Sequence, residues 1–299
     1  MNRICLLVFF LAVFFSASVS GQNISNEGYD FWAVFPTHVA SGNGGTTTTN
    51  HANIAVFVTS KNDSRVTVSC GSYAETKNIP ANSAIQFDIT WAQAYVNFAE
   101  ANTNLINRGI HIRVEDGKPK VSAYAHMYGA ARSAASLILP FETLGQTYYS
   151  MNYTQLSGAP QGNNYLTLVA AEANTTVLLH EKNGDVLKIT LANPGDVYEY
   201  MPNNFGELTG VYVEVDKETY SCKRFAAFSG SSVLYIACSG SQDPLYQQLY
   251  PTTSWGKNYG AVPFIGRRYI LRILAQEDNT TVTYNGQTYP LNKGSFHES

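Results

Sequence analysis

Asn174-Thr175-Thr176-Val177 recurs as Asn279-Thr280-Thr281-Val282, which lies 105 residues further along the chain. A second pair of stretches keeps nearly the same step, because Gly109-Ile110-His111-Ile112-Arg113-Val114 is matched by Gly210-Val211-Tyr212-Val213-Glu214-Val215. Asp63-Ser64-Arg65-Val66 is a degenerate earlier copy of the first motif. A repeat of this period indicates that each copy folds as one structural unit of a tandem array.

The repeated stretches have the pattern of β-strands. Residues 110–114 and 211–215 alternate apolar and polar side chains, which is typical of a half-buried strand. Asp116-Gly117, Asn183-Gly184 and Asn285-Gly286 suit tight hairpin turns, and we expect the Asn-Thr-Thr loops to close hairpins as well. Further strands are expected at 54–59, 66–70, 84–89 and 121–128. Charged residues make up only 14% of the chain, which also favours an all-β, antiparallel protein.

We expect two complete units at residues 28–140 and 141–251 and an incomplete third unit at 252–299. About seven short-connected strands per unit of about 105 residues favour a sandwich-like module, with the blades of a β-propeller as the alternative. Two weakly patterned helical candidates, 91–105 and 244–249, are expected to be largely loop. A unit that stops near its fourth strand cannot bury its own face. Either the polypeptide continues in a longer product, or the partial unit completes a sheet of its neighbours.

The N-terminus has the layout of a secretory signal peptide. Arg3 precedes the apolar run of residues 4–15, and small residues follow at 16–21. The run is shorter than the roughly 20 residues that cross a bilayer. We therefore expect residues 1–21 to be removed and the mature protein to be secreted, with no membrane span. The formal net charge of −3 excludes a basic footprint for nucleic acid.

Cysteines and glycosylation sequences fit an exported protein. Cys222 and Cys238 flank one short strand pair, and we expect a disulfide between them, with Cys70 unpaired or bonded to another chain. The Asn-x-Ser/Thr sequence predicts a glycoprotein and occurs at Asn23, Asn62, Asn152, Asn174 and Asn279. At the last two positions the same residues also suit a loop between strands, with or without sugar.

Catalytic and metal-binding constellations are missing from the sequence. It contains no Gly-x-Ser-x-Gly elbow, no Cys-x-x-Cys pair and no Asp-x-Asp-x-Asp-Gly loop. The histidines are scattered, and Glu277-Asp278 lies where a turn is expected. We therefore expect no enzyme, no cofactor and no metal, and a secreted hydrolase is the least favoured alternative.

Several ordered motifs resemble a known family. Ala226-Ala227-Phe228-Ser229-Gly230 is followed by Cys238 and by Gln248-Leu249-Tyr250-Pro251-Thr252-Thr253-Ser254-Trp255-Gly256-Lys257-Asn258-Tyr259. Together with Leu139-Pro140-Phe141 and Leu144-Gly145, these stretches resemble the N-terminal module of the IgGFc-binding proteins over residues 28–299. The resemblance implies a secreted protein of mucus or extracellular matrix that is largely β-structure and binds proteins or glycoproteins.

Aromatic residues near the unit junctions are the candidate binding residues, and we single out Tyr250 and Trp255. The Gly-rich loop at 41–51 and the connection at 244–255 are the candidate binding surfaces. Equivalent loops of tandem units tend to emerge on one side, so glycans at the Asn-Thr-Thr loops and at the earlier copy would make that side unsuited to a dry interface. A glycan-binding, lectin-like protein is the alternative function.

Overall fold

The computed structural model describes residues 25–38, 52–129, 132–154, 162–202, 206–219, 222–236, 241–262, 265–266 and 269–299. Within these residues the regular secondary structure is almost entirely antiparallel β-strand, which confirms the all-β prediction. The helices are single turns, namely α2 (Trp91–Ala94), η1 (Phe98–Glu100), η2 (Phe141–Thr143) and η4 (Thr252–Ser254). The second helical candidate, residues 244–249, lies almost wholly in a strand, β17 (Gln242–Gln248).

The first repeat contributes two four-stranded sheets. One has the order β1 (Asp30–Ala33), β7 (Ile110–Val114), β3 (Ser64–Cys70) and β4 (Tyr73–Ile79). The other has the order β5 (Ser83–Ile89), β2 (Asn53–Ser60), β8 (Ser122–Tyr128) and β9 (Ser133–Ile138). The chain therefore passes between the two sheets after β2 and returns after β4.

The second repeat has the same strand order. β10 (Thr147–Tyr149), β15 (Tyr212–Val215), β12 (Thr175–His180) and β13 (Val186–Leu191) form one sheet. The other sheet has the order β14 (Val197–Tyr200), β11 (Asn164–Ala170), β16 (Phe225–Tyr235) and β17. The free edge of β14 pairs with β6 (Asn104–Leu105) of the first repeat. Each repeat is thus a pair of sheets, and the two repeats interlock at β6.

The third repeat consists of two two-stranded sheets. β18 (Arg272–Leu274) pairs with β21 (Phe296–Glu298), and β19 (Thr280–Tyr284) pairs with β20 (Gln287–Leu291). These four strands correspond to β11, β14, β12 and β13, because the same hydrogen bonds recur. The N–H of Ala170 donates to Asp196 O at 3.0 Å, and that of Ala275 donates to Ser295 O at 3.0 Å. Neither sheet of the third repeat joins a sheet of another repeat in the described residues, so the expectation that it completes a neighbouring sheet is wrong there.

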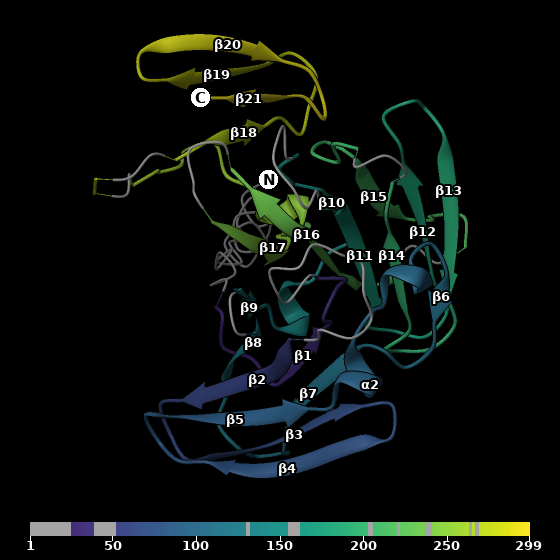
Figure 1. Cartoon of the computed structure of the whole chain (residues 1–299), viewed down its shortest axis with the longest axis vertical. Coiled ribbons are helices and arrows are strands. Elements are labelled where there is room, and N and C mark those ends of the chain that lie inside the picture. Colours follow the sequence, from purple (N-terminus) through teal and green to yellow (C-terminus); the bar gives the residue numbers. More distant parts are fainter. Residues whose placement is uncertain are drawn as a thin grey trace, which may run out of the picture.

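The four larger sheets have a propeller-like arrangement, and the third repeat lies at one end of the molecule (Figure 1). This matches the alternative taken from the sequence. The residue limits assigned to the three units stay predictions.

Two kinds of turn were assigned wrongly from the sequence. The Asn-Thr-Thr loop at Asn174 joins β11 to β12, and these strands belong to different sheets, so it does not close a hairpin. Asp116-Gly117 likewise links β7 to β8 across two sheets. The hairpin turns were right at Asn183-Gly184, between β12 and β13, and at Asn285-Gly286, between β19 and β20. Asn285 and Gly286 both have positive φ, 50° and 75°, as a two-residue hairpin requires.

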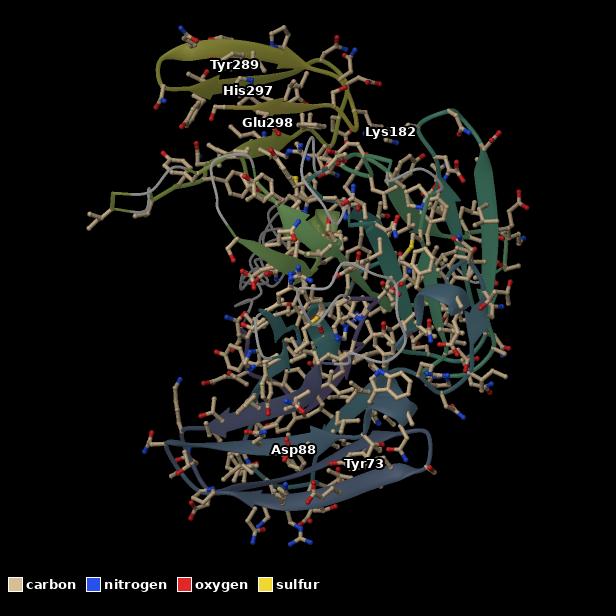
Figure 2. All side chains as sticks on the ribbon, in the orientation of Figure 1. Tyr73, Asp88, Lys182, Tyr289, His297 and Glu298 are labelled. Atoms are coloured by element: carbon tan, nitrogen blue, oxygen red, sulfur yellow. The ribbon has the colours of Figure 1, made fainter. Side chains whose placement is uncertain are left out.

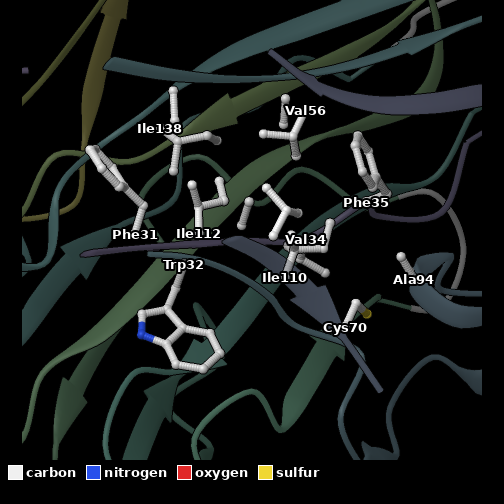
Figure 3. Packing of buried hydrophobic residues seen from close by; sticks show 14 of the residues in the cluster. Phe31, Trp32, Val34, Phe35, Val56, Cys70, Ala94, Ile110, Ile112 and Ile138 are labelled. Carbon is white, nitrogen blue, oxygen red and sulfur yellow. The ribbon is translucent and has the colours of Figure 1, made fainter. Parts of the chain in front are cut away.

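The largest core cluster extends from the first repeat into the second. Phe31 and Ile112 are cross-strand partners with no exposed surface, and they gather with Ile138 between the sheets (Figure 3). The cluster also includes Phe228 and Tyr246 of the second repeat. The Tyr246 hydroxyl donates to Val34 O at 2.7 Å, which satisfies this polar atom inside the core. The two repeats therefore bury apolar surface jointly.

Candidate functional site

A pocket of about 670 Å³ lies where the second repeat meets the third. Its walls come from β10, from the β12–β13 hairpin, from the start of β15 and from the turn before β21. The lining residues are Tyr149, His180, Glu181, Lys182, Gly210, Tyr212, Asp278, Lys293, Gly294, Ser295 and Phe296. A volume of this size is in the usual range for a ligand site.

The junction between the first two repeats is built in the same way. There the backbones meet where Gly109 donates its N–H to Gly195 O at 2.8 Å, and Trp32 lies beneath the turn with only 7% of its surface exposed. Tyr149 holds the position of Trp32 in the second repeat, since Trp32 pairs with His111 of β7 and Tyr149 pairs with Tyr212, the equivalent residue of β15. Tyr149 is likewise buried, with 3% of its surface exposed.

One wall of the pocket is a row of rings across three strands. Tyr149 of β10 is the cross-strand partner of Tyr212 of β15, which in turn is the partner of His180 of β12. The ring centroids of Tyr149 and Tyr212 are 5.4 Å apart, and those of Tyr212 and His180 are 4.1 Å apart at an interplanar angle of 3°. Directly opposed side chains of an antiparallel sheet lie close enough to stack in this way. The row therefore follows from the strand register.

Charged groups of both signs surround this row. The Lys293 ammonium lies 4.3 Å from the Tyr212 ring centroid, and the Lys182 ammonium lies 5.9 Å from that of Phe296. Figure 2 shows Lys182 on the side of the second repeat that faces the third. Partial burial lowers the pKa of Lys182. Glu181 and Asp278 supply carboxylates, so the pocket presents cations, anions and aromatic surface together.

Arg272 of β18 fixes the third repeat against the second. Its Nη1 donates to Glu207 Oε2 at 2.8 Å and to Thr209 Oγ1 at 2.9 Å, and its Nε donates to Glu298 Oε2 at 2.6 Å. The guanidinium also lies 4.6 Å from the Phe296 ring centroid. Only 12% of the arginine side chain is exposed, so these charge-assisted bonds are shielded from solvent. Tyr149 adds a further link, because its hydroxyl donates to Gln276 O at 3.1 Å. The pocket walls are therefore held in place.

Residues 134–299 match the family model described as IgGFc binding protein, and this region is more than half of the chain. The chain belongs to the IgGFc binding protein family. This is a family of extracellular binding domains and not of enzymes. Every residue that lines the pocket falls inside the matched region. A comparison with curated proteins gave no match.

Two further observations concern the described part of this IgGFc binding family member. None of its helices is long and apolar enough to cross a membrane. No group of three or more His, Cys, Asp or Glu side chains is placed there to hold a metal ion. The predicted signal peptide at residues 1–21 lies outside the described residues.

The predicted binding residues lie next to the pocket but do not line it. The Trp255 ring centroid is 5.6 Å from that of Tyr149, and Trp255 Nε1 donates to Tyr250 O at 3.2 Å. Tyr250 is 42% exposed. The connection that was expected to bind is shorter than predicted, because β17 includes residues 244–248. The Gly-rich loop at 41–51 lies outside the described residues.

The sequence missed the pocket itself, and His180 and Tyr212 show why. Each lies in a strand in which buried and partly exposed residues alternate. A tyrosine or histidine in such a strand is compatible with ordinary packing, so the sequence does not mark it as a site residue. The repeat is the one signal in the sequence that could have located this wall. Tyr149 lies in the first strand of the second repeat, and Tyr212 becomes its cross-strand partner once the pairing of the two strands is known.

The structure separates the predicted glycosylation sites. Asn62, Asn174 and Asn279 are exposed, and glycans there stay a prediction, whereas Asn23 lies outside the described residues. Asn152 is buried, and its Nδ2 donates to Tyr165 O at 3.1 Å and to Gly230 O at 2.6 Å. A glycan would replace one of those protons and would have no room, so the structure contradicts a sugar at Asn152.

The cysteines are placed as follows. Cys222 is exposed, but Cys238 lies outside the described residues, so their disulfide stays a prediction. Cys70 is a buried free thiol whose Sγ lies 3.5 Å from Gln93 O and from Arg108 O. Burial raises the pKa of this thiol to about 11. The Asn107 O lies 3.6 Å away as a third carbonyl neighbour. A thiol buried in this way is not accessible to another chain, so the structure agrees with an unpaired Cys70 and not with the intermolecular alternative.

Proposed function

We propose that this protein is an extracellular binding module that binds a protein or glycoprotein partner through the pocket between its second and third repeats. The pocket carries this proposal because it combines a fixed row of rings with exposed ammonium groups inside the region that matches the family model. Tyr250 and Trp255 extend the same face, which gives a partner both aromatic and charged contacts. Mucus or extracellular matrix is the expected setting.

A glycan-binding function is the second candidate. The mixed polar and aromatic lining of the pocket favours it, because sugar hydroxyl groups need both donors and acceptors while sugar rings pack on aromatic side chains. The two candidates differ in the ligand and use the same residues.

Removing both lysines at the pocket rim is expected to weaken partner binding about tenfold or more, which corresponds to about 1.4 kcal/mol. The variant is Lys182→Ala with Lys293→Ala. Both side chains are exposed and lie over rings of the lining, so their loss removes charge and cation–π contacts without opening the core. The measurement is surface plasmon resonance with an immunoglobulin G Fc fragment as the first ligand, followed by glycoproteins captured from a mucous secretion.

The matched control removes two exposed lysines of the first repeat, Lys118→Ala with Lys120→Ala, which lie outside the matched region. This control lowers the net charge by the same amount, so it separates a pocket effect from an effect of overall charge. Equal losses in both variants, or none in either, would contradict the pocket as the binding site. Loss of binding after enzymatic removal of the ligand's sugars would instead favour the glycan-binding candidate.

A further inference from the structure

Two lysines reach across the junction between the second and third repeats in opposite directions. Lys182, in the β12–β13 hairpin of the second repeat, places its ammonium 5.9 Å from the ring centroid of Phe296 in β21. Lys293, in the turn before β21 of the third repeat, places its ammonium 4.3 Å from the ring centroid of Tyr212 in β15. All four residues line the pocket. Each of the two repeats that form the pocket therefore contributes an ammonium group to it.

These two ammonium groups have no counterion in the described part of the chain. Neither forms an ion pair there, whereas Lys188 of β13 pairs with Asp216 at 2.6 Å. Partial burial is the largest cause that lowers the pKa of Lys182, and the charge of Arg272 lowers it further, although Glu207 raises it. A bound anion beside Lys182 would replace the water that this ammonium loses on burial and would favour its charged form.

The carboxylates of the pocket are already bonded to the protein. Asp278 Oδ1 accepts the backbone N–H of Lys293 at 3.0 Å. Burial raises the pKa of Tyr200, and its hydrogen bond to Glu181 raises it further, so this glutamate is also engaged. The lining therefore offers two ammonium groups to an anion, while the second carboxylate oxygens can accept hydrogen bonds from hydroxyl groups of a ligand.

The pocket lies where the first repeat has a longer connection. Residues 90–109 join β5 to β7 and contain α2 and η1, whereas residues 201–211 join β14 to β15. The longer connection contacts the β3–β4 hairpin, because Gln93 Nε2 donates to Ser72 Oγ at 3.0 Å. In the second repeat, Gly210 is the one described residue of the connection that lines the pocket. The pocket therefore occupies the side of the hairpin that the longer connection contacts in the first repeat.

The strands that carry the row of rings offer no backbone edge to a ligand. β12 pairs with β13 and β15, and β15 pairs with β10 and β12. Beside the row the backbones of the two repeats meet so closely that a Cβ on Gly210 would overlap Gly294 O. A peptide therefore has no strand of the row to extend. A sugar suits such a pocket, because it presents hydroxyl groups and apolar C–H groups around one compact ring.

We propose that the pocket binds an acidic sugar of a glycoprotein, whose carboxylate or sulfate group is bound by the ammonium groups of Lys182 and Lys293. This rests on the binding function proposed above, because the sugar occupies the same pocket. The sugar ring lies against Tyr212 and Phe296, and its hydroxyl groups bond to Asp278 Oδ2 and to the neighbouring polar groups of the lining. The charge-assisted bonds to the two lysines give the preference for an acidic over a neutral sugar.

The test uses two pairs of probes that differ in the acidic group alone. Sialyllactose is compared with its methyl ester, and lactose sulfated on galactose is compared with lactose. Binding to the wild-type chain is measured by isothermal titration calorimetry at low and high salt. In at least one pair the acidic probe is expected to bind about tenfold or more tightly at low salt, and added salt should reduce this difference. The pair that shows the difference identifies the acidic group.

Lys182→Gln with Lys293→Gln is expected to remove the preference for the acidic probe, because this variant has lost both cations. Lys182→Arg with Lys293→Arg should retain it, since guanidinium groups also bind carboxylate and sulfate groups. The matched control is Lys118→Gln with Lys120→Gln in the first repeat, which changes the net charge equally and should leave the preference as in the wild type.

Asp278→Asn is expected to tighten binding of the acidic probe about threefold and to leave the neutral probe unchanged. The asparagine oxygen can still accept the Lys293 N–H, whereas the negative charge that repels an acidic sugar is gone.

Equal affinity within both pairs, or no binding of any probe, would overturn the acidic-sugar proposal. A preference that survives in the glutamine variant would overturn it as well, because the lysines would not be its cause. The binding function proposed above fails separately. An Fc fragment from which the sugars have been removed, and whose binding is lost in the glutamine variant, would keep the pocket as the binding site even if no oligosaccharide bound.

Discussion

Replacing Gly145 by alanine is expected to lower the free energy of unfolding by about 3 kcal/mol, which is at the upper end of the range for overpacking a well-filled site. The new methyl group would lie 2.3 Å from Pro251 Cβ and 3.1 Å from Pro251 Cγ. A proline ring has no rotamer that moves these atoms away, so the backbone of one segment must shift. Such a shift also strains the bond from the Gly145 N–H to Tyr148. The measurement is urea unfolding followed by tyrosine and tryptophan fluorescence.

The repeat provides the control for this prediction within the same protein. Gly256→Ala is expected to change the free energy of unfolding by less than about 0.5 kcal/mol, as is usual for an open surface position. Gly28→Ala should resemble Gly145→Ala, because the Pro140 ring stands equally close. If all three variants were equally stable, the proline contacts would not be what makes glycine necessary in the complete repeats.

The sequence predicted the strands better than it predicted their partners. Periodic alternation at residues 110–114 and 211–215 located β7 and β15 nearly to the residue. The Asn-Thr-Thr motif is a repeated turn, but the prediction that it closes a hairpin is wrong at Asn174. Such a motif encodes a local reversal, and Asn174 and Asn279 do have positive φ, 54° and 57°. The strand after the turn can pair with the strand before it or enter another sheet. The choice depends on which faces of the two strands are buried in the folded protein, and the residues of the turn do not encode this.

The candidate site was less predictable than the fold for a related reason. Trp255 is predictable as an aromatic residue near a unit junction, and it does lie against Tyr149. Lys293 and Asp278 could not be found, because they line the pocket only after the third repeat is placed on the second through Arg272. At Asn152 the sequence predicted a site that the structure does not support. A sequon is recognised from three neighbouring residues, whereas the burial that excludes a sugar depends on the whole fold.

Glu199 of β14 is a buried carboxylate at the contact between the first two repeats. It has no exposed surface, and its Oε2 accepts hydrogen bonds from the Thr37 N–H at 3.2 Å and from Thr167 Oγ1 at 2.9 Å. Oε1 has no hydrogen-bond partner in the described part of the chain. Burial raises the pKa of Glu199 to about 7, with a smaller contribution from the charge of Glu100, although the bonds from Thr37 and Thr167 lower it. The folded protein therefore favours the neutral acid.

This raised pKa predicts that the protein loses stability as the pH rises from about 4.5 to above 7. In that window the folded state holds a proton that the unfolded chain has released, because an unperturbed glutamate has a pKa of 4.5. The difference of about 2.5 pH units corresponds to about 3 kcal/mol of unfolding free energy. Glu199→Gln keeps an acceptor oxygen for Thr37 and Thr167 but has no proton to lose, so its stability should be nearly constant across this window. The measurement is urea unfolding of both proteins at several pH values between 4.5 and 8.5.

Glu142→Gln is the control, because Glu142 is an exposed carboxylate and its replacement should leave the pH dependence as in the wild type. The sign of the slope is the decisive observation. A wild-type protein that gained stability between pH 4.5 and 7, or a Glu199→Gln variant with the wild-type slope, would show that Glu199 is ionised in the folded state. Stability that falls with rising pH in the wild type but not in Glu199→Gln would instead show that Glu199 is the neutral acid. That acid lies at the contact between the two repeats, since Thr37 belongs to the first repeat and Thr167 to the second. Acidic conditions would then strengthen the contact between the first two repeats. The pocket at the next junction should be unchanged, because Glu199 is not one of its lining residues.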